Sequence, residues 1–134
     1  MILVDSSVWV DYFNGTASSE TDFLNAALGS EPVAIGDLIL AEVLQGFRSH
    51  SDYEVAKGMF MSLTVFDLLS TEIALKAADN YRTLRRRGVT VRKTVDCIIA
   101  AFCIERHLPL LLYSDRDFDP FVKSLGLASA FSST

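Results

Sequence analysis

Short apolar runs alternate with helical patterns along this chain. The runs, which predict strands, lie at residues 2–4, 33–35, 64–68 and 110–113. Apolar segments of this length are typical of strands that are buried on both faces of a parallel sheet. Between them, apolar residues recur at helical spacing in the segments 6–13, 18–28, 38–47, 52–63, 70–87, 94–104 and 121–125. Strands that alternate with helices predict an α/β domain with right-handed crossovers.

The order of the strands follows from the same pattern. If the first strand is central, the second joins it on one side and the 110–113 strand on the other, which gives the order 3-2-1-4. The segment 127–131 is a candidate fifth strand at the edge, which extends the order to 3-2-1-4-5. With 134 residues, the chain is long enough for one domain, 1–134, whose core needs no disulfide or structural metal.

The first strand ends at an acid. Asp5 follows Val4 and precedes Ser6 and Ser7, which favour the start of a helix. In open α/β sheets ligands bind outside the carboxyl ends of the strands, so Asp5 is a candidate site residue. The alternative is that Asp5 only caps the helix that follows it. Both interpretations stay open unless other acids converge on the same place.

Two helices each carry a single acid among apolar residues. Glu42 is the one charge in the middle of the 38–47 helix, whose apolar residues on nearly all sides predict that it is largely buried. A lone buried carboxylate is costly unless it is paired, for example with Arg48, or binds a metal. Asp96 lies in the first turn of an apolar helix that Thr94 is expected to cap, and the helix dipole alone favours an acid there. Both acids are therefore site candidates with a structural alternative.

A second group of acids follows the 110–113 strand. Asp115 and Asp117 are the candidates there, and which of them belongs to the site is open. Because Asp5 and Asp115 end adjacent parallel strands, we expect them about 5 Å apart in the hydrogen-bonding direction. Asp96 reaches the same edge of the sheet only if the loop 89–93 returns the chain to that side. The expected cluster consists of Asp5, Glu42, Asp96 and Asp115.

Such a cluster predicts a metal site. Four carboxylates in one place repel one another, and without cations some of them would hold protons. A divalent cation removes this conflict. Because the ligands are oxygens with no histidine or cysteine set nearby, the sequence favours Mg²⁺ or Mn²⁺ over zinc. Such an ion supports phosphoryl transfer by activating a water and stabilising the leaving oxygen.

The charge is unevenly distributed. The formal net charge of -5 argues against loose electrostatic binding to nucleic acid. Half of the 12 basic residues nevertheless lie in one stretch around Gly88, called here the basic segment. It consists of Arg82, Arg85, Arg86, Arg87, Arg92 and Lys93. It is either a solvated helix end, where cations favour the negative end of the helix dipole, or a phosphate-binding surface.

The other reactive residues give weaker signals. Cys97 and Cys103 do not share a helix face, which supports neither a disulfide nor a zinc site, so we expect buried thiols. His50 and His107 are isolated and are expected to be structural. No apolar run is long enough to span a bilayer, and Asp5 interrupts the N-terminus before any signal-peptide core, so we expect a cytoplasmic protein.

Four motifs together resemble the PIN-domain family, and in particular the VapC-like toxin ribonucleases of bacterial toxin-antitoxin pairs. The motifs are DSSVWVDYF after the first strand, LAEVLQGF around Glu42, TVDCIIAAF around Asp96, and YSDRDFDPF after the last internal strand. Each motif is weak alone, whereas the four in this order and in a chain of this size are specific. The resemblance covers essentially the whole chain. Ser114 departs from it, because a threonine or histidine often stands there.

The resemblance implies a three-layer α/β/α fold with a four- or five-stranded parallel sheet. It implies an endoribonuclease that depends on Mg²⁺ or Mn²⁺ and cuts single-stranded or loop RNA, with the basic segment on the RNA backbone. It also implies a cognate antitoxin as inhibitor, a homodimer, and a heterotetramer or larger assembly with that antitoxin. By matching motif, the catalytic metal-binding acids are Asp5, Glu42, Asp96 and Asp115. Ser6 or Ser7 would lie near the metal, and Asp117 is an alternative or second-layer acid.

Three other functions compete with this one. A phosphatase with an aspartyl nucleophile commonly carries a second acid two residues after the first, where this chain has Ser7. A receiver domain would need paired acids after the first strand and a phosphorylatable acid after the third, whereas this chain offers Asp67 inside the predicted third strand. A catalytically idle binding module of the same fold is the third alternative. Acids at all four positions speak against it, and an activity measurement decides.

Overall fold

A four-stranded parallel sheet forms the middle of the computed structural model, which describes residues 1–114 and 117–131. The predicted strand order is confirmed as β3-β2-β1-β4. Each neighbouring pair is parallel, and β1 is central because Leu3 is paired with both Ala34 and Leu110. The strands are β1 (Ile2–Val4), β2 (Val33–Gly36), β3 (Thr64–Phe66) and β4 (Leu110–Leu111).

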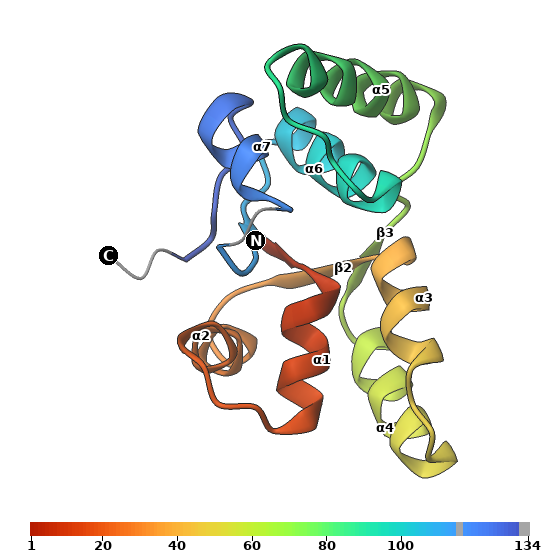
Figure 1. The fold of residues 1–134 in the computed structure, drawn as a ribbon. Helices are drawn as coiled ribbons and strands as arrows, with labels where there is room; N and C mark the ends of the chain where they lie inside the picture. Colours follow the sequence, from red (N-terminus) through yellow and green to blue (C-terminus); the bar gives the residue numbers. More distant parts are fainter. Residues whose placement is uncertain (115–116, 132–134) are drawn as a thin grey trace.

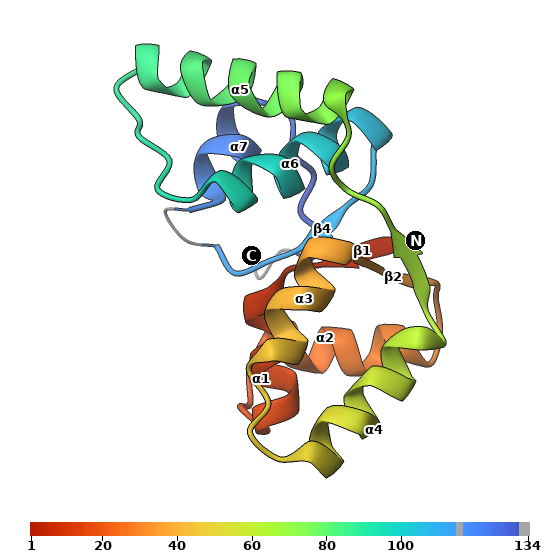
Figure 2. The same cartoon turned by 90° about the vertical axis from the view of Figure 1, so that its right-hand side faces the viewer.

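Helices cover both faces of this sheet, which confirms the three-layer α/β/α architecture (Figures 1 and 2). One layer consists of α1 (Ser6–Asn14), α2 (Ser19–Leu28), α3 (Asp37–Gln45) and α4 (His50–Met61). The other consists of α5 (Thr71–Arg86), α6 (Thr94–Arg106) and α7 (Asp119–Ser124). None of these helices, which come from the described ranges, is long and apolar enough to cross a membrane.

The central strand explains why the site residues lie where they do. Leu3 and Val4 are fully buried, as expected for a strand with helices on both faces. The backbone N–H of Asp5 still donates to the carbonyl of Leu111 at 2.9 Å, so the sheet holds the chain to the point where α1 begins. Trp9, also fully buried, then packs on Phe60 with ring centroids 4.9 Å apart. Packing on both sides thus fixes the acid at the end of β1.

The candidate fifth strand is reduced to a single isolated bridge. Leu110 pairs in parallel with Ser129, and its N–H donates to the carbonyl of Ala128 at 2.9 Å. Only Leu127 of that segment is buried, so little apolar surface holds it against the sheet edge. The four-stranded form of the prediction is therefore the observed one.

The structure corrects three local predictions. Helix α3 is not buried on nearly all sides, because Ala41 and Glu42 lie on an exposed face between its contacts with α1 and α4. Helix α6 is preceded by Lys93 rather than capped by Thr94, and the Lys93 side chain makes no capping hydrogen bond. Helix α7 begins at Asp119, before the expected start at Phe121, because Pro120 is readily accommodated in a first helical turn.

Gly36 joins β2 to α3 and leaves no room for a side chain. A Cβ at this position would overlap the side chain of Leu68, which is fully buried and so cannot move aside cheaply. We expect Gly36→Ala to lower the free energy of unfolding by about 1–3 kcal/mol, as overpacking does. Urea denaturation would measure this. The matched variant Gly58→Ala, at a helical position with open space around it, should not destabilise the protein.

Candidate active site

Asp5 lies at the carboxyl end of β1 and is 6% exposed. Its backbone is extended, and its Oδ2 accepts hydrogen bonds from the N–H of Ser7 at 3.4 Å and from the Ser7 hydroxyl at 2.6 Å. Asp5 therefore does cap α1, as one interpretation of the sequence held. Ser7 also fixes the orientation of the carboxylate, whereas Ser6, the first residue of α1, is half-buried and makes no such bond.

Asp96 lies in the first turn of α6 and is 9% exposed. Its pKa is raised to about 6, mainly by loss of hydration and next by the negative charge of Asp5. Lys93 opposes this effect, while Asp117 and Glu42 add smaller repulsions. With a pKa of about 6, this carboxyl group is mostly ionised at pH 7, at a cost in free energy that a bound cation would offset, and it takes up a proton as the pH falls through 6. The helix dipole alone, which would favour the charged form, does not account for this environment.

Glu42 reaches the same place from the middle of α3. Its side chain is exposed rather than buried, and it forms no ion pair with Arg48, which corrects both structural expectations for this residue. Partial loss of hydration raises its pKa, and the charge of Asp5 raises it as well, while Lys93 lowers it. The same two neighbours, Asp5 and Lys93, thus act on Glu42 and on Asp96.

Three of the four predicted acids, which come from β1, α3 and α6, therefore act electrostatically on one another. The fourth, Asp115, lies outside the described residues. Asp117 acts on Asp96 and forms an ion pair with Arg92 at 3.1 Å. In residues 1–114 and 117–131, no three His, Cys, Asp or Glu side chains lie close enough together to hold a metal ion. The described carboxylates repel one another without forming a closed set of ligands.

A family model for the PIN domain matches residues 2–122. The chain belongs to the PIN-domain family. Ribonuclease VapC11 of Mycobacterium tuberculosis is 36% identical over 135 residues, which cover 97% of this chain and 98% of that protein. Ribonuclease VapC1 of Methanocaldococcus jannaschii is 29% identical over 126 residues, which cover 94% of this chain and 84% of that protein. The predicted resemblance to PIN domains named VapC is confirmed.

Solved structures show the same PIN fold. VapBC2 from Rickettsia felis, bound to a promoter DNA fragment, matches with a TM-score of 0.74 and 19% identity over 96% of this chain and 97% of that one. A toxin-antitoxin complex from Klebsiella pneumoniae matches with a TM-score of 0.70 and 19% identity over 98% and 99%. At this identity the likeness concerns the fold, and it agrees with the strand order of this PIN domain.

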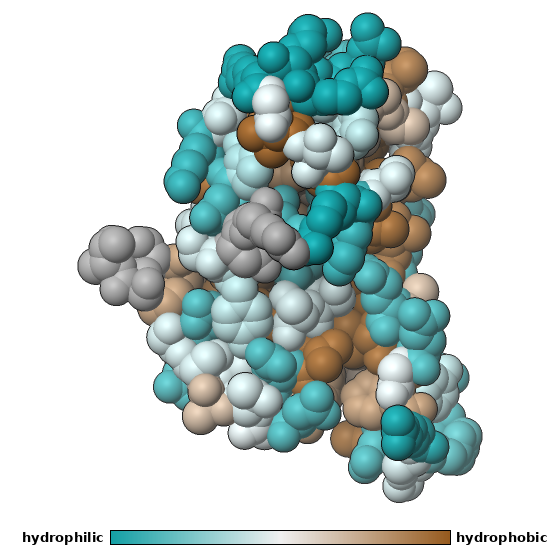
Figure 3. All heavy atoms as spheres, in the orientation of Figure 1, coloured by the Kyte–Doolittle hydropathy of each residue, from teal (hydrophilic) through white to brown (hydrophobic). Residues whose placement is uncertain are grey.

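The basic segment of this PIN domain divides into two parts. Arg82, Arg85 and Arg86 belong to the end of α5, and Arg87 follows it, all exposed. Hydrophilic side chains accordingly cover the α5 end of the molecule in Figure 3. The other part, Arg92 and Lys93, lies beside the acids. Among the described residues, this second part acts on the carboxylates, through the Arg92–Asp117 ion pair and the charge of Lys93.

Tyr113 is a residue that sequence reasoning missed. Its hydroxyl donates to Oδ2 of Asp11 at 2.6 Å and lies 3.3 Å from the Ser18 hydroxyl, so it ties the end of β4 to α1 and to the start of α2. Loss of hydration and the Asp11 hydrogen bond raise the pKa of Tyr113, which keeps the hydroxyl protonated as a donor. The partners are 102 positions apart, and no local pattern signals such a contact.

Proposed function

We propose that this PIN domain is a divalent-metal-dependent endoribonuclease, a VapC-like toxin that hydrolyses RNA phosphodiester bonds. The observation that carries the proposal is the electrostatic convergence of Asp5, Glu42 and Asp96 from three separate elements. The relatives named VapC ribonucleases, which align with nearly the whole chain, support the same activity. The fold alone would not, since one fold serves many functions.

The donor set fits a hard divalent cation. Carboxylate oxygens are the ligands that Mg²⁺ and Mn²⁺ prefer, and a cation would offset both the loss of hydration and the repulsion from Asp5, which together raise the pKa of Asp96 to about 6. Asp5, Glu42 and Asp96 would hold the ion, with Asp115 or Asp117 as the fourth acid. When bound, such an ion supplies positive charge for the scissile phosphate and a water of lowered pKa.

Three further roles in the proposed reaction belong to Ser7, Glu42 and Lys93. Ser7 orients the Asp5 carboxylate through its 2.6 Å hydrogen bond. Glu42, exposed and with a raised pKa, is suited either to bind the metal or to accept a proton from the attacking water. Lys93, whose charge acts on Asp96, is the cation that would face a bound phosphate.

A protein antitoxin is the partner we propose for this chain. The structural neighbours include a toxin-antitoxin complex and VapBC assemblies, which supports a partner of the same kind here. Binding of such a partner would neutralise the nuclease, and a homodimer with antitoxin in a heterotetramer or larger assembly is the expected form. A small open reading frame beside the gene, co-expressed with this chain, would test the pairing by co-purification and by loss of RNA cleavage.

Cleavage of cellular RNA by the purified chain tests the proposed activity. The chain should cut RNA in Mg²⁺ or Mn²⁺, leave duplex DNA intact, and lose the activity when a chelator is added. Restoring the ion should restore the cutting. RNA cleavage that continues undiminished in chelator would contradict the proposed metal dependence.

The exposed arginines of the basic segment should set the salt dependence of RNA binding. Replacing Arg85, Arg86 and Arg87 by glutamine should reduce the slope of log K against log[salt] by about 2, given roughly 0.7 per phosphate contact on a single strand. Fluorescence anisotropy with a labelled, uncleavable RNA measures this slope. The control is Arg48→Gln, an exposed arginine between α3 and α4. An unchanged slope in the triple variant would mean that these arginines form a solvated helix end and do not bind phosphate.

A further inference from the structure

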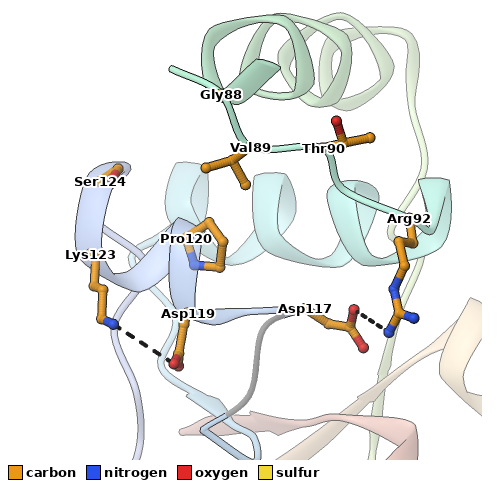
Figure 4. Close-up of a pocket in the computed structure, with 9 residues that line it drawn as sticks. All are labelled: Gly88, Val89, Thr90, Arg92, Asp117, Asp119, Pro120, Lys123 and Ser124. Carbon is orange, nitrogen blue, oxygen red and sulfur yellow. Dashed lines mark hydrogen bonds and ion pairs between the residues drawn. The ribbon is translucent and has the colours of Figure 1, made fainter. Parts of the chain in front are cut away.

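A pocket of about 690 Å³ opens between the loop that joins α5 to α6 and helix α7 (Figure 4). One wall comes from Gly88, Val89, Thr90 and Arg92, and the other comes from Asp117 and α7. Pockets of about 300–1,000 Å³ are typical of sites for small organic ligands. This one is therefore large enough for a nucleotide.

The pocket adjoins the candidate active site. Asp117 lines the pocket and also acts electrostatically on Asp96, so the pocket and the acid cluster are neighbours. At its other side, Gly88 directly follows the α5 arginines. An RNA strand with one phosphate at the acids and another at the basic segment would therefore run across this pocket.

The lining combines apolar surface with polar edges. Val89 and Pro120 lie across the pocket from each other in Figure 4, and Thr90 also lines the pocket. A nucleobase has the matching chemistry, because its faces are apolar and its edges carry donors and acceptors. A base in a duplex is stacked and paired and cannot enter, so the pocket fits an unpaired nucleotide.

A cation stands at each end of the pocket, held by a weak ion pair (Figure 4). Arg92 pairs with Asp117 at 3.1 Å, and Lys123 lies 4.0 Å from Asp119. The two basic side chains are 53% and 77% exposed, and ion pairs this exposed contribute little to stability. Asp119 also accepts a hydrogen bond from the Ser114 hydroxyl at 3.0 Å, so it keeps a partner when Lys123 turns to a phosphate.

We propose that this pocket binds one unpaired nucleotide of the RNA substrate, next to the scissile phosphate. The two flanking phosphates replace Asp117 and Asp119 as the ion-pair partners of Arg92 and Lys123. This inference rests on the proposed function and adds to it a subsite that selects single-stranded RNA and contacts one base. Its residues lie on α7, on the loop before α6 and at Asp117, and of these only Asp117 is also a candidate for the acid cluster.

Binding of a nuclease-resistant RNA tests the subsite without cleavage. The probe is a short 2′-O-methyl single strand, measured by fluorescence anisotropy at one fixed salt concentration. Thr90→Trp, which adds a large ring at an exposed position that lines the pocket, should weaken binding about tenfold. Lys123→Ala should weaken it about threefold, while Lys57→Ala on α4 should bind like the unaltered protein. The same RNA as a duplex should bind the unaltered protein at least about tenfold more weakly.

A parallel cleavage assay separates failure of the subsite from failure of the proposed function. The unaltered protein is incubated with the unmodified RNA and Mg²⁺. If it cuts, but Thr90→Trp and Lys123→Ala both bind the probe like the unaltered protein, the subsite is refuted and the nuclease stands. If it does not cut under any metal condition, the proposed function fails with the inference. Lys123→Ala, at an exposed position, decides the outcome if Thr90→Trp does not fold.

Discussion

Asparagine in place of Asp96 is expected to reduce RNA cleavage at least about a hundredfold, because several kcal/mol of transition-state stabilisation depends on the ion that this carboxylate helps to hold. Asp5→Asn should have an effect of the same size, since the Asp5 carboxylate acts on both other acids. Initial rates on one RNA in Mg²⁺, followed by gel electrophoresis, would measure the loss. Both variants should keep the far-UV circular dichroism of the unaltered protein, because asparagine is nearly isosteric with aspartate.

Asp67→Asn is the matched control for these variants. Asp67 directly follows β3 at the same edge of the sheet, is exposed, and is not among the charges that shift the pKa of Asp96 or Glu42. Its cleavage rate should equal that of the unaltered protein. Cleavage by Asp5→Asn and Asp96→Asn at the control rate would show that the two acids have only structural roles.

The second large effect concerns stability in the absence of metal. The pKa of Asp96 is raised from 3.8 to about 6 in the folded protein. The folded state therefore binds this proton more tightly than the unfolded state, and the resulting stability is present below about pH 4 and lost as the pH rises through 6. Asp96→Asn cannot lose that stability, because its amide is neutral throughout. In chelator at neutral pH, the variant should be more stable than the unaltered protein by about 2 kcal/mol.

Urea denaturation at several pH values measures this difference. The free energies of unfolding of the two proteins should converge near pH 4 and separate as the pH approaches 7. Adding Mn²⁺ at about a hundred times its dissociation constant should then stabilise the unaltered protein by about 2.7 kcal/mol and Asp96→Asn by much less. If Asp96→Asn is no more stable than the unaltered protein in chelator at pH 7, the carboxylate is not strained by burial and repulsion.

Much of this arrangement follows from local signals. An apolar run that ends in Asp5 places a carboxylate at a strand tip, and parallel strands bring their carboxyl ends to one edge. The right-handed connections then carry α3 and α6 toward that edge, and with them Glu42 and Asp96. These steps depend only on pattern and handedness, which is why the fold and the meeting of three acids could be predicted.

The features that the sequence did not predict depend on how the helices and strands pack against each other. The sequence of α3 is apolar at most positions, yet its neighbours α1 and α4 leave the side that carries Glu42 exposed. The Arg92–Asp117 ion pair joins positions 25 residues apart, and periodicity carries no information about such pairs. The segment 127–131 has strand-like residues, but a single bridge holds it because only Leu127 is buried. Tertiary packing decides each of these cases.

Diffraction from crystals soaked in Mn²⁺ would show directly whether the acids bind a metal ion, because anomalous scattering locates the ion whether or not the protein is active. We expect one or two ions bound by oxygens of Asp5 and Asp96, with Glu42 as a ligand or one water away. The same map would decide between Asp115 and Asp117. An ion bound elsewhere, or no ion near Asp5 in crystals of a protein that cuts RNA, would contradict this expectation.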